Sequence, residues 1–302
     1  MYPLPIYIFP KPKGDDWPTV QEAINDLKEI FLFESLKGKI KIIIDENKIQ
    51  HDSIIFSLGG DGTMLSAMRL GMQYSAAVYG INLGNIGFLT DYTYSPIRKN
   101  EFRELILDLL NYEQSGFNPE DFRNFSKFKW QTNERMAIET ELGPYQKTIA
   151  LNEFSLARKE SDSMIFYKLD INGQHAGVHR ANSLLISTPS GCTGYALSVG
   201  GALILPSADV IQIVPVAPFT LTSRPLIVSD SARIKVTVWG GKEVVLRGDG
   251  QLVKNYPTER DTDTVTLTFR GGGVANVLTS NQNNYFTNLN TKLGWTNNWK
   301  IG

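Results

Sequence analysis

The sequence predicts an α/β N-terminal domain with an open, mostly parallel sheet, followed by an all-β sandwich domain and a C-terminal tail that packs back. In roughly the first 110 residues, short apolar runs alternate with segments of helical spacing, as in βαβ units. Farther along, helical spacing is scarce, and turn signals such as Asn172-Gly173 and Asp249-Gly250 separate short strand-like runs. We therefore expect domains at residues 1–115 and 116–275, and a tail at 276–302 that returns to the first domain.

The N-terminal domain should contain alternating strands and helices. Apolar residues recur at helical spacing in residues 19–33, for example at Val20, Ile24 and Leu27. Thr63 is expected to cap the helix that follows a buried strand and a glycine-rich turn. The expected strands are residues 6–9, 40–44, 53–58 and 77–82, and the expected helices are residues 19–33, 63–72 and 97–110.

The second domain should be built from strands. Residues 115–120 are interpreted as a linker, residues 193–200 as a short helix, and the tail aromatics Trp295 and Trp299 as packing back on the body. The expected strands are residues 125–130, 135–140, 147–150, 163–171, 183–187, 210–214, 232–238, 243–248 and 264–270.

Composition narrows the class of protein. The chain has 302 residues, of which 42% are hydrophobic and 20% charged, as in soluble globular proteins. A net charge of −1 gives no reason to expect nucleic acid or an anionic membrane as a partner. The single cysteine, Cys192, excludes an intrachain disulfide and a cysteine-built metal site. The sequence shows no signal-peptide pattern and no apolar run as long as the ~20 residues needed to span a bilayer. We therefore expect a cytoplasmic protein.

The most informative motif is Gly59-Gly60-Asp61-Gly62-Thr63, directly after an apolar strand. Glycines at the carboxyl end of a strand let the backbone approach a phosphate, and the following helix N-terminus favours negative charge. An aspartate there would repel a phosphate unless it holds Mg²⁺ or takes a proton from an attacking hydroxyl. Both roles remain open at this point, beside the plainer one of a helix cap.

Two further segments could bind a ligand. Asn152-Glu153 follows a strand, although exposed polar loop residues are common and a solvated pair is the favoured interpretation from these residues alone. The block from Ser187 to Gly201 is dense in hydroxyls and backbone amides and suits an anion or a nucleotide.

Other candidates are weaker. His175 and His179 lie four residues apart but on no predicted helix, which disfavours a paired metal site. Cys192 is interpreted as a small loop residue. Neither a P-loop nor a Rossmann glycine fingerprint occurs. Candidate phosphate partners, each of which is more simply a solvated surface charge, are Lys11, Lys13, Arg180, Arg224 and Arg247.

Taken together, these motifs resemble those of the NAD kinase family. The resemblance covers roughly residues 54 to 253 and rests on four blocks in the family's order. These are Gly59–Thr63, Asn82-Leu83-Gly84 with Gly87-Phe88-Leu89, Asn152-Glu153, and Ser187–Gly201. Arg224-Pro225-Leu226 and Asp249-Gly250-Gln251 also resemble later family positions. The first block alone is shared with diacylglycerol and sphingosine kinases and partly with phosphofructokinases, whereas the four together are specific.

The resemblance implies a reaction. The family transfers the terminal phosphoryl group of ATP, or of polyphosphate in some members, to the 2′-hydroxyl of the adenosine ribose of NAD. By resemblance, Asp61 is the base on that hydroxyl, and Gly60, Gly62 and Thr63 shape the phosphate turn. Mg²⁺ accompanies ATP, and a homo-oligomer is expected. The remaining implied contacts are Phe88 at the adenine, Asn152 and Glu153 at the adenosine, and Thr193, Tyr195 and Ser198 in the NAD pocket.

The chain departs from the family pattern at three places. The usual Asp-Gly, whose aspartate contacts the nicotinamide half of NAD, is replaced by Asn182-Ser183. The usual Gly-Ser-Thr-Ala-Tyr is replaced by Gly191-Cys192-Thr193-Gly194-Tyr195, and a histidine is replaced by Phe219. Two alternatives to an NAD kinase therefore stay open. One is a lipid or sphingoid-base kinase of the same superfamily, and the other is a catalytically degenerate nucleotide-binding protein.

Overall fold

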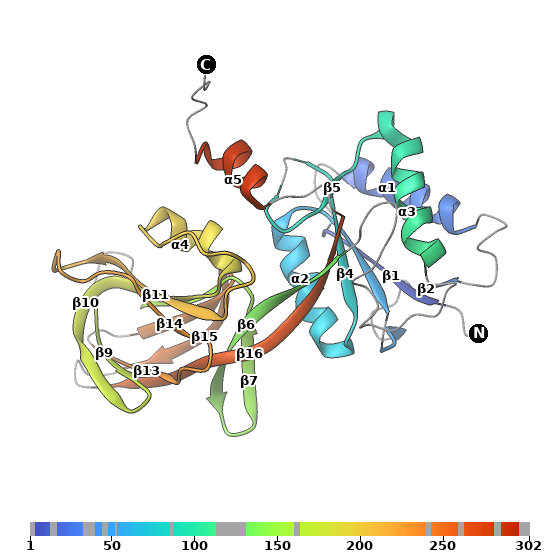
Figure 1. Cartoon of the computed structure of the whole chain (residues 1–302). Coiled ribbons are helices and arrows are strands. Elements are labelled where there is room, and N and C mark those ends of the chain that lie inside the picture. Colours follow the sequence, from blue (N-terminus) through green and yellow to red (C-terminus); the bar gives the residue numbers. More distant parts are fainter. Residues whose placement is uncertain are drawn as a thin grey trace, which may run out of the picture. The chain divides into compact units, whose positions relative to one another are not determined.

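The computed structural model describes residues 4–12, 17–32, 40–43, 48–51, 53–84, 87–112, 131–159, 164–239, 243–258, 263–280 and 285–295. The chain divides into two compact units. Unit 1 comprises residues 1–134 together with 275–302, and unit 2 comprises residues 135–274. Each unit has its own buried core. Figure 1 shows the helices and strands of both units.

The strands of unit 1 form a parallel sheet, as expected. Its order is β2-β1-β3-β4, and β5 and the end of β16 also pair in parallel with β4. The apolar, β-branched runs that predicted buried strands are indeed buried, because every residue of β3 and β4 is shielded from solvent. The strands are β1 (Leu4–Pro10), β2 (Ile40–Ile43), β3 (Ile54–Leu58), β4 (Ala77–Asn82), β5 (Tyr92–Thr93) and β16 (Val265–Thr279).

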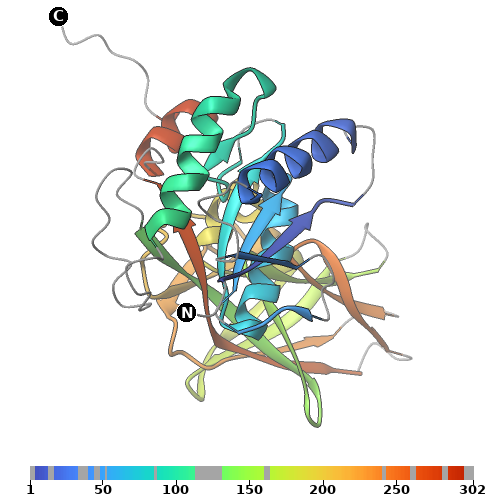
Figure 2. The same cartoon turned by 90° about the vertical axis from the view of Figure 1, so that its right-hand side faces the viewer.

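Helices cover both faces of this sheet. Ile54, Phe56 and Leu58 share a core with α1 and α3, whereas Val78 on β4 lies against Gly71 of α2. Figures 1 and 2 show α1 and α3 together on one side of the sheet and α2 on the other. The helices are α1 (Trp17–Phe31), α2 (Asp61–Tyr74), α3 (Lys99–Tyr112), which follows a 3₁₀ turn at Pro96–Arg98, and α5 (Tyr285–Leu293).

Unit 2 is an antiparallel β domain built around the long strand β10. Residues 174–181 of β10 pair with β9, and residues 183–187 pair with β8, so β10 belongs to two sheets. One sheet has the order β15-β14-β8-β10-β11-β12, and the other has the order β10-β9-β13-β16-β6-β7. Their inner side chains form one core, in which the rings of Phe154 and Phe269 lie 5.5 Å apart.

The strands of unit 2 have the following bounds. They are β6 (Gln131–Gly143), β7 (Gln146–Ala150), β8 (Glu153–Arg158), β9 (Ile165–Ile171), β10 (Gln174–Ser187), β11 (Val210–Pro218), β12 (Leu226–Ser229), β13 (Ile234–Trp239), β14 (Glu243–Gly248) and β15 (Gln251–Pro257). The expected two-domain fold, α/β followed by antiparallel β, is confirmed.

Several elements differ from the sequence prediction. β10 begins at Gln174 instead of Ser183, and its first half has no strand signature because it is largely exposed and rich in polar residues. β5, β8, β12 and β15 were not predicted. The expected strand at 125–130 and the linker at 115–120 lie outside the described residues.

The tail returns to unit 1, but the described one of the two predicted tryptophans, Trp295, is largely exposed. Residues 276–278 extend the sheet, and α5 follows with Leu289 only 2% exposed. Trp295 is 53% exposed, and Trp299 lies outside the described residues. No helix in the described part of the chain has both the length and the apolar character needed to cross a bilayer.

Candidate active site

The predicted site residues fall into one group in each unit. In unit 1, Asp61 is the first residue of α2, and Gly60 is the N-cap, with φ −91° and ψ −167° and no side-chain capping bond. The expected cap, Thr63, is wrong, because the helix begins two residues before it. Thr63 instead lies against Gly59, where a Cβ atom would overlap its hydroxyl group. A carboxylate in the first turn suits the positive end of the helix dipole.

The carboxylate of Asp61 binds the second glycine-rich turn. Its Oδ2 accepts a hydrogen bond of 2.8 Å from the Phe88 amide, and its Oδ1 accepts one of 3.0 Å from the Leu89 amide. A Cβ atom on Gly87 would overlap the Asp61 carboxylate, so only glycine allows this approach. The two glycine motifs, which are separate in sequence, therefore form one structure.

Lys292 of α5 joins this structure from the other end of the chain. Its Nζ donates a hydrogen bond to the Gly87 carbonyl oxygen and lies 4.4 Å from the centroid of the Phe88 ring. Burial lowers the pKa of the Lys292 ammonium group, while the nearby Asp61 carboxylate raises it. Sequence reasoning missed Lys292, because a lysine in the last turn of a helix is ordinary.

The first glycine turn is open above its backbone. Gly60 and Gly62 are exposed, and no atom lies within 4 Å of where a Cβ atom on either residue would be. Because the turn opens a helix, its N–H groups and the helix dipole favour an anion in that space. The turn thus has the shape that the sequence predicted for phosphate binding.

In unit 2, Asp249 organises the predicted Asn152-Glu153 pair. Its carboxylate accepts hydrogen bonds from three successive amides, at 3.0 Å from Leu151, 2.7 Å from Asn152 and 3.1 Å from Glu153. The Asp249 amide in turn donates to the Glu153 carbonyl oxygen at 2.9 Å. Asp249 adopts the left-handed conformation, with φ 48°, in the turn between β14 and β15.

Glu153 is buried, which contradicts its interpretation as part of a solvated pair. Its side chain is 6% exposed, and burial raises its pKa to about 7, with a further contribution from the negative charge of Asp249. Glu153 Oε2 and Asn152 Oδ1 have no hydrogen-bond partner among the described residues. Buried polar atoms without partners are uncommon and suit a site that a polar ligand completes.

The Ser187–Gly201 block contacts the Asn152-Glu153 segment. Thr188 donates from its hydroxyl to the Leu151 carbonyl oxygen at 2.6 Å and from its amide to the Asn152 carbonyl oxygen at 2.8 Å. The Cβ position of Gly194 is only 3.5 Å from Asn152 Nδ2 and 3.6 Å from Glu153 Oε2. The block and the pair therefore form one polar recess, which a larger residue at position 194 would narrow.

The expected helix at 193–200 is wrong in detail. A 3₁₀ turn at Ser190–Thr193 and a single helical turn, α4 (Tyr195–Ser198), are interrupted at Gly194, whose φ of −96° and ψ of −132° are not helical. Thr193 is half-buried, Tyr195 is 46% exposed and Ser198 is exposed. Cys192 is fully buried, with its Sγ 3.2 Å from the Ile204 amide, as a small loop residue should be.

Asn182 is exposed on β10, two residues beyond Arg180. The Arg180 guanidinium lies over the rings of Phe166 and Phe219, at 5.2 Å and 4.9 Å from their centroids. Arg180 is therefore held by aromatic contacts on this face of the strand. Arg224 and Arg247 are exposed, and Lys13 lies outside the described residues.

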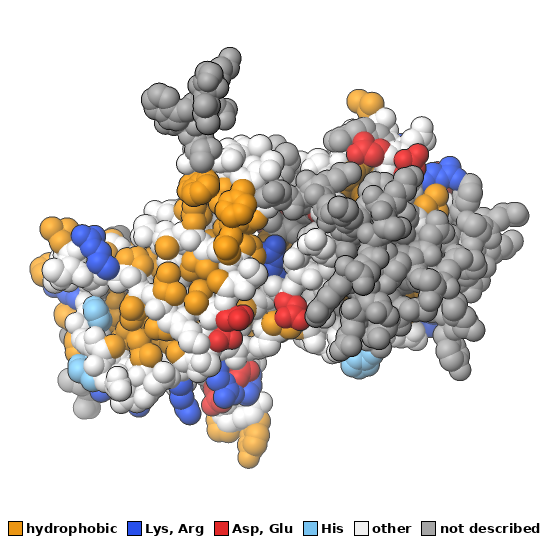
Figure 3. Space-filling model, viewed as in Figure 1, with side chains coloured by type: hydrophobic (Ala, Val, Ile, Leu, Met, Phe, Trp, Pro, Cys, Tyr) orange, Lys and Arg blue, Asp and Glu red, His pale blue; other side chains and the backbone are white. Residues whose placement is uncertain are grey.

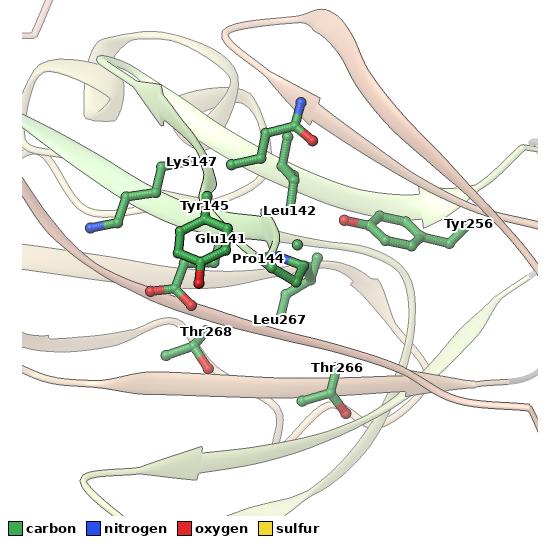
Figure 4. A pocket seen from close by; sticks show the side chains of 11 residues that line it. Glu141, Leu142, Pro144, Tyr145, Lys147, Tyr256, Thr266, Leu267 and Thr268 are labelled. Carbon is green, nitrogen blue, oxygen red and sulfur yellow. The ribbon is translucent and has the colours of Figure 1, made fainter.

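A separate cavity of about 740 Å³ lies under the β6–β7 hairpin in unit 2 (Figure 4). Its lining includes Tyr145, Lys147, Tyr256 and Thr266. None of the predicted site residues lines it, so the cavity is distinct from both groups of candidate residues.

Comparisons with known proteins agree with these observations. The sequence model of the ATP-NAD kinase N-terminal domain matches residues 35–113, and that of the ATP-NAD kinase C-terminal domain matches residues 151–267. A protein of Azotobacter vinelandii named NAD kinase is 34% identical over 244 residues, which cover 80% of this chain and 76% of that protein.

Two solved structures have the same fold. Yeast NADH kinase complexed with NADH matches with a TM-score of 0.74 and 18% identity, covering all of this chain and 91% of the other. An NAD kinase from Archaeoglobus fulgidus in complex with ATP matches with a TM-score of 0.66 and 20% identity, covering 97% of this chain and all of the other.

Proposed function

The chain belongs to the ATP-NAD kinase family, and we propose that it transfers the terminal phosphoryl group of ATP to the 2′-hydroxyl of the adenosine ribose of NAD, giving NADP. The observation that carries this proposal is the fixed carboxylate of Asp61 in the first turn of α2, beside the open backbone of Gly60 and Gly62. Phosphoryl transfer needs little more than positioning and charge stabilisation, and a base on the attacking hydroxyl adds to both.

Asp61 is the base in this proposal. Its two hydrogen bonds to the Phe88 and Leu89 amides orient the carboxylate, so that it needs no rearrangement when the hydroxyl arrives. The open turn at Gly60, Gly62 and Thr63 receives phosphate oxygens, and Phe88 lies at the adenine. The proposed role of the aspartate beside this phosphate-binding turn is therefore to deprotonate a sugar hydroxyl.

Asn152 and Glu153 hold the adenosine part of NAD. Their unpartnered oxygens can accept hydrogen bonds from ribose hydroxyls or from the adenine amino group. Thr193, Tyr195 and Ser198, which are partly or largely exposed on the neighbouring block, line the rest of the NAD pocket. Asn182 contacts the nicotinamide half through a carboxamide instead of a carboxylate.

Mg²⁺ enters with the nucleotide. The described part of the chain contains no group of three or more His, Cys, Asp or Glu residues that could hold a metal ion. These residues do not fit a metal held by the protein alone. Mg²⁺ commonly keeps several waters and binds through substrate phosphates, so Mg·ATP is the proposed form of the donor.

We further propose a cytoplasmic homo-oligomer. Figure 3 shows exposed apolar side chains on one face of unit 2. In and beside the β11–β12 connection, the exposed apolar residues are Phe219, Leu221, Leu226 and Ile227, which are 43% to 86% exposed. Clustered exposed apolar residues favour protein–protein contact. Analytical ultracentrifugation of the purified protein tests this assembly, and a monomer at micromolar concentration would contradict it.

The activity is tested with purified protein, Mg²⁺, ATP and NAD. NADP should form, and Asp61→Asn should lower kcat by about 10²-fold or more, because the amide cannot accept the hydroxyl proton. Asp230→Asn, in the turn after β12, is the matched control and should leave kcat unchanged.

Three outcomes would contradict the proposal. Absence of NADP with either ATP or polyphosphate, despite nucleotide binding, would identify a degenerate binding protein. Phosphorylation of a lipid or sphingoid base instead of NAD would identify the other kinase class. Full activity of Asp61→Asn would exclude Asp61 as the base.

A further inference from the structure

The C-terminal helix brings a cation to the turn that Asp61 holds. Asp61 binds the Gly87–Leu89 turn through the amides of Phe88 and Leu89, and Lys292 binds the same turn through the carbonyl oxygen of Gly87 and the face of the Phe88 ring. The turn is thus held by an anion on its N–H groups and by a cation on its carbonyl and aromatic groups. Without the Asp61 carboxylate or without the Lys292 ammonium group, the turn would keep only one of these two sets of contacts.

Helix α5 is built to present Lys292. Leu289, about one turn earlier, is 2% exposed, so this side of the helix is buried. Gly294 adopts a left-handed φ of 60°, its amide donates to the Asn290 carbonyl oxygen, and the Trp295 amide donates to that of Leu289. These bonds end the helix at Leu293, so Lys292 lies in its last turn. A lysine in a last turn usually extends into solvent, whereas burial here lowers its pKa and Asp61 opposes that effect.

A cation at this position also reduces the electrostatic repulsion between the Asp61 carboxylate and the substrate phosphates. A carboxylate next to incoming phosphates repels them, and Mg²⁺ neutralises only part of the charge of ATP. An ammonium group that lies beside Asp61 reduces this repulsion without taking up the carboxylate oxygens, which bind amides. Lys292 therefore has both a geometric and an electrostatic effect on the same turn.

We infer that Lys292 is a positioning residue for phosphoryl transfer, which fixes the Gly87–Leu89 turn and, through it, the Asp61 carboxylate. This inference rests on the proposed function. Its consequence is that the C-terminal helix, which contains none of the family motifs, completes the reaction centre of unit 1. No substrate contact by Lys292 is required.

The inference is tested with Lys292→Met and Lys292→Arg, with Lys41→Met on exposed β2 as the matched control. Lys292→Met should lower kcat by about 10²-fold through misplacement of Asp61 and change KM for NAD less than about threefold. Lys292→Arg, which keeps the charge and the donors, should retain at least ten times the kcat of Lys292→Met. Lys41→Met should match the wild type.

Charge rescue makes the test more specific. Lys292→Cys treated with 2-bromoethylamine regains an ammonium group at nearly the same length, and the native Cys192 is fully buried and shielded from the reagent. Modification verified by mass should restore kcat at least tenfold. Failure of the verified adduct to restore kcat, or a kcat of Lys292→Met within twofold of the wild type, would overturn the inference.

Hydrogen exchange separates this inference from the proposed function. In Lys292→Met, the Phe88 and Leu89 amides that bind Asp61 should exchange at least tenfold faster than in the wild type, and the core strand β3 should be unchanged. This readout does not depend on NADP formation, so it tests whether Lys292 fixes the Gly87–Leu89 turn even if the wild type proves inactive. Unchanged exchange at Phe88 and Leu89 would overturn it.

Discussion

Glu153 is the residue at which burial and charge most directly control chemistry. Its carboxyl group is 6% exposed, lies near Asp249 and has its pKa raised from 4.5 to about 7. Between pH 4.5 and pH 7 the folded protein keeps a proton that the unfolded chain has already lost. The free energy of unfolding therefore falls as the pH rises through this window, and the destabilisation is complete above pH 7.

Replacing Glu153 should remove that pH dependence. A shift from 4.5 to about 7 corresponds to about 3 kcal/mol, so Glu153→Gln should be more stable than the wild type by up to about 3 kcal/mol at pH 8.5 and nearly equal at pH 4.5. Urea denaturation without nucleotide at both pH values measures the difference. Exposed Glu141→Gln is the control, and an undiminished pH dependence in Glu153→Gln would contradict the assignment.

Gly87 offers a second prediction at the scale of single residues. A Cβ atom there would overlap the Asp61 carboxylate, whereas one on Gly84, in the same connection, would have open space. Gly87→Ala should therefore displace Asp61 and lower kcat/KM by about 10²-fold, and Gly84→Ala should stay close to the wild type. Steady-state kinetics of NADP formation compare the two. Equal effects of the two substitutions would contradict a specific overlap between residue 87 and Asp61.

At the scale of elements, the turn between β14 and β15 supports the loop that precedes β8. The left-handed Asp249 carboxylate satisfies three successive amides, at Leu151, Asn152 and Glu153, and so fixes the direction of the two side chains that the recess needs. Unsatisfied buried donors are costly, which explains why one carboxylate can determine the conformation of a whole loop.

Asp249→Asn should disturb this loop while tolerating the left-handed conformation. Asparagine offers one acceptor oxygen and places an NH₂ group toward amides that donate, so the unfolding free energy should fall by about 3 kcal/mol. KM for NAD should rise by about tenfold, with a smaller change in kcat, because the adenosine contacts move and Asp61 does not. Asp230→Asn is the control in a comparable turn. A change in kcat alone would contradict this assignment.

The elements also show what a sequence can predict. Buried strands such as β3 and β4 have local signatures, and so they were predicted correctly, as was the turn that leads from β3 into a helix at Asp61. The first half of β10 is mostly polar and exposed, and β12 is a run of only four residues, none of them buried, so neither has the pattern of a buried strand. The contacts of Asp61 with Phe88 and of Asp249 with Asn152 join positions far apart in the chain, and no local pattern contains them. Lys292 has no signature at all, because only the folded tail places it.

At the scale of the whole molecule, the chain builds two cores, and the first is closed only when the tail returns. Leu278, near the end of β16, is fully buried in the unit 1 core with Phe56 and Tyr79, although β16 starts in unit 2. Residues 276–278 pair with β4. Completion of the sheet that carries Asp61 therefore depends on residues that follow the entire β domain in sequence.

Leu278→Ala should destabilise unit 1 selectively. Removing a buried leucine side chain costs about 2–5 kcal/mol, and that loss falls on the core to which Leu278 belongs. Hydrogen exchange should show lost protection in β3 and β4 and unchanged protection in β9 and β13, whose core residues are in unit 2. Val274→Ala, four residues earlier and 44% exposed, is the control and should leave both units protected. Equal loss of protection in the two units would mean that they unfold as one cooperative body, and that the returning tail does not stabilise unit 1 by itself.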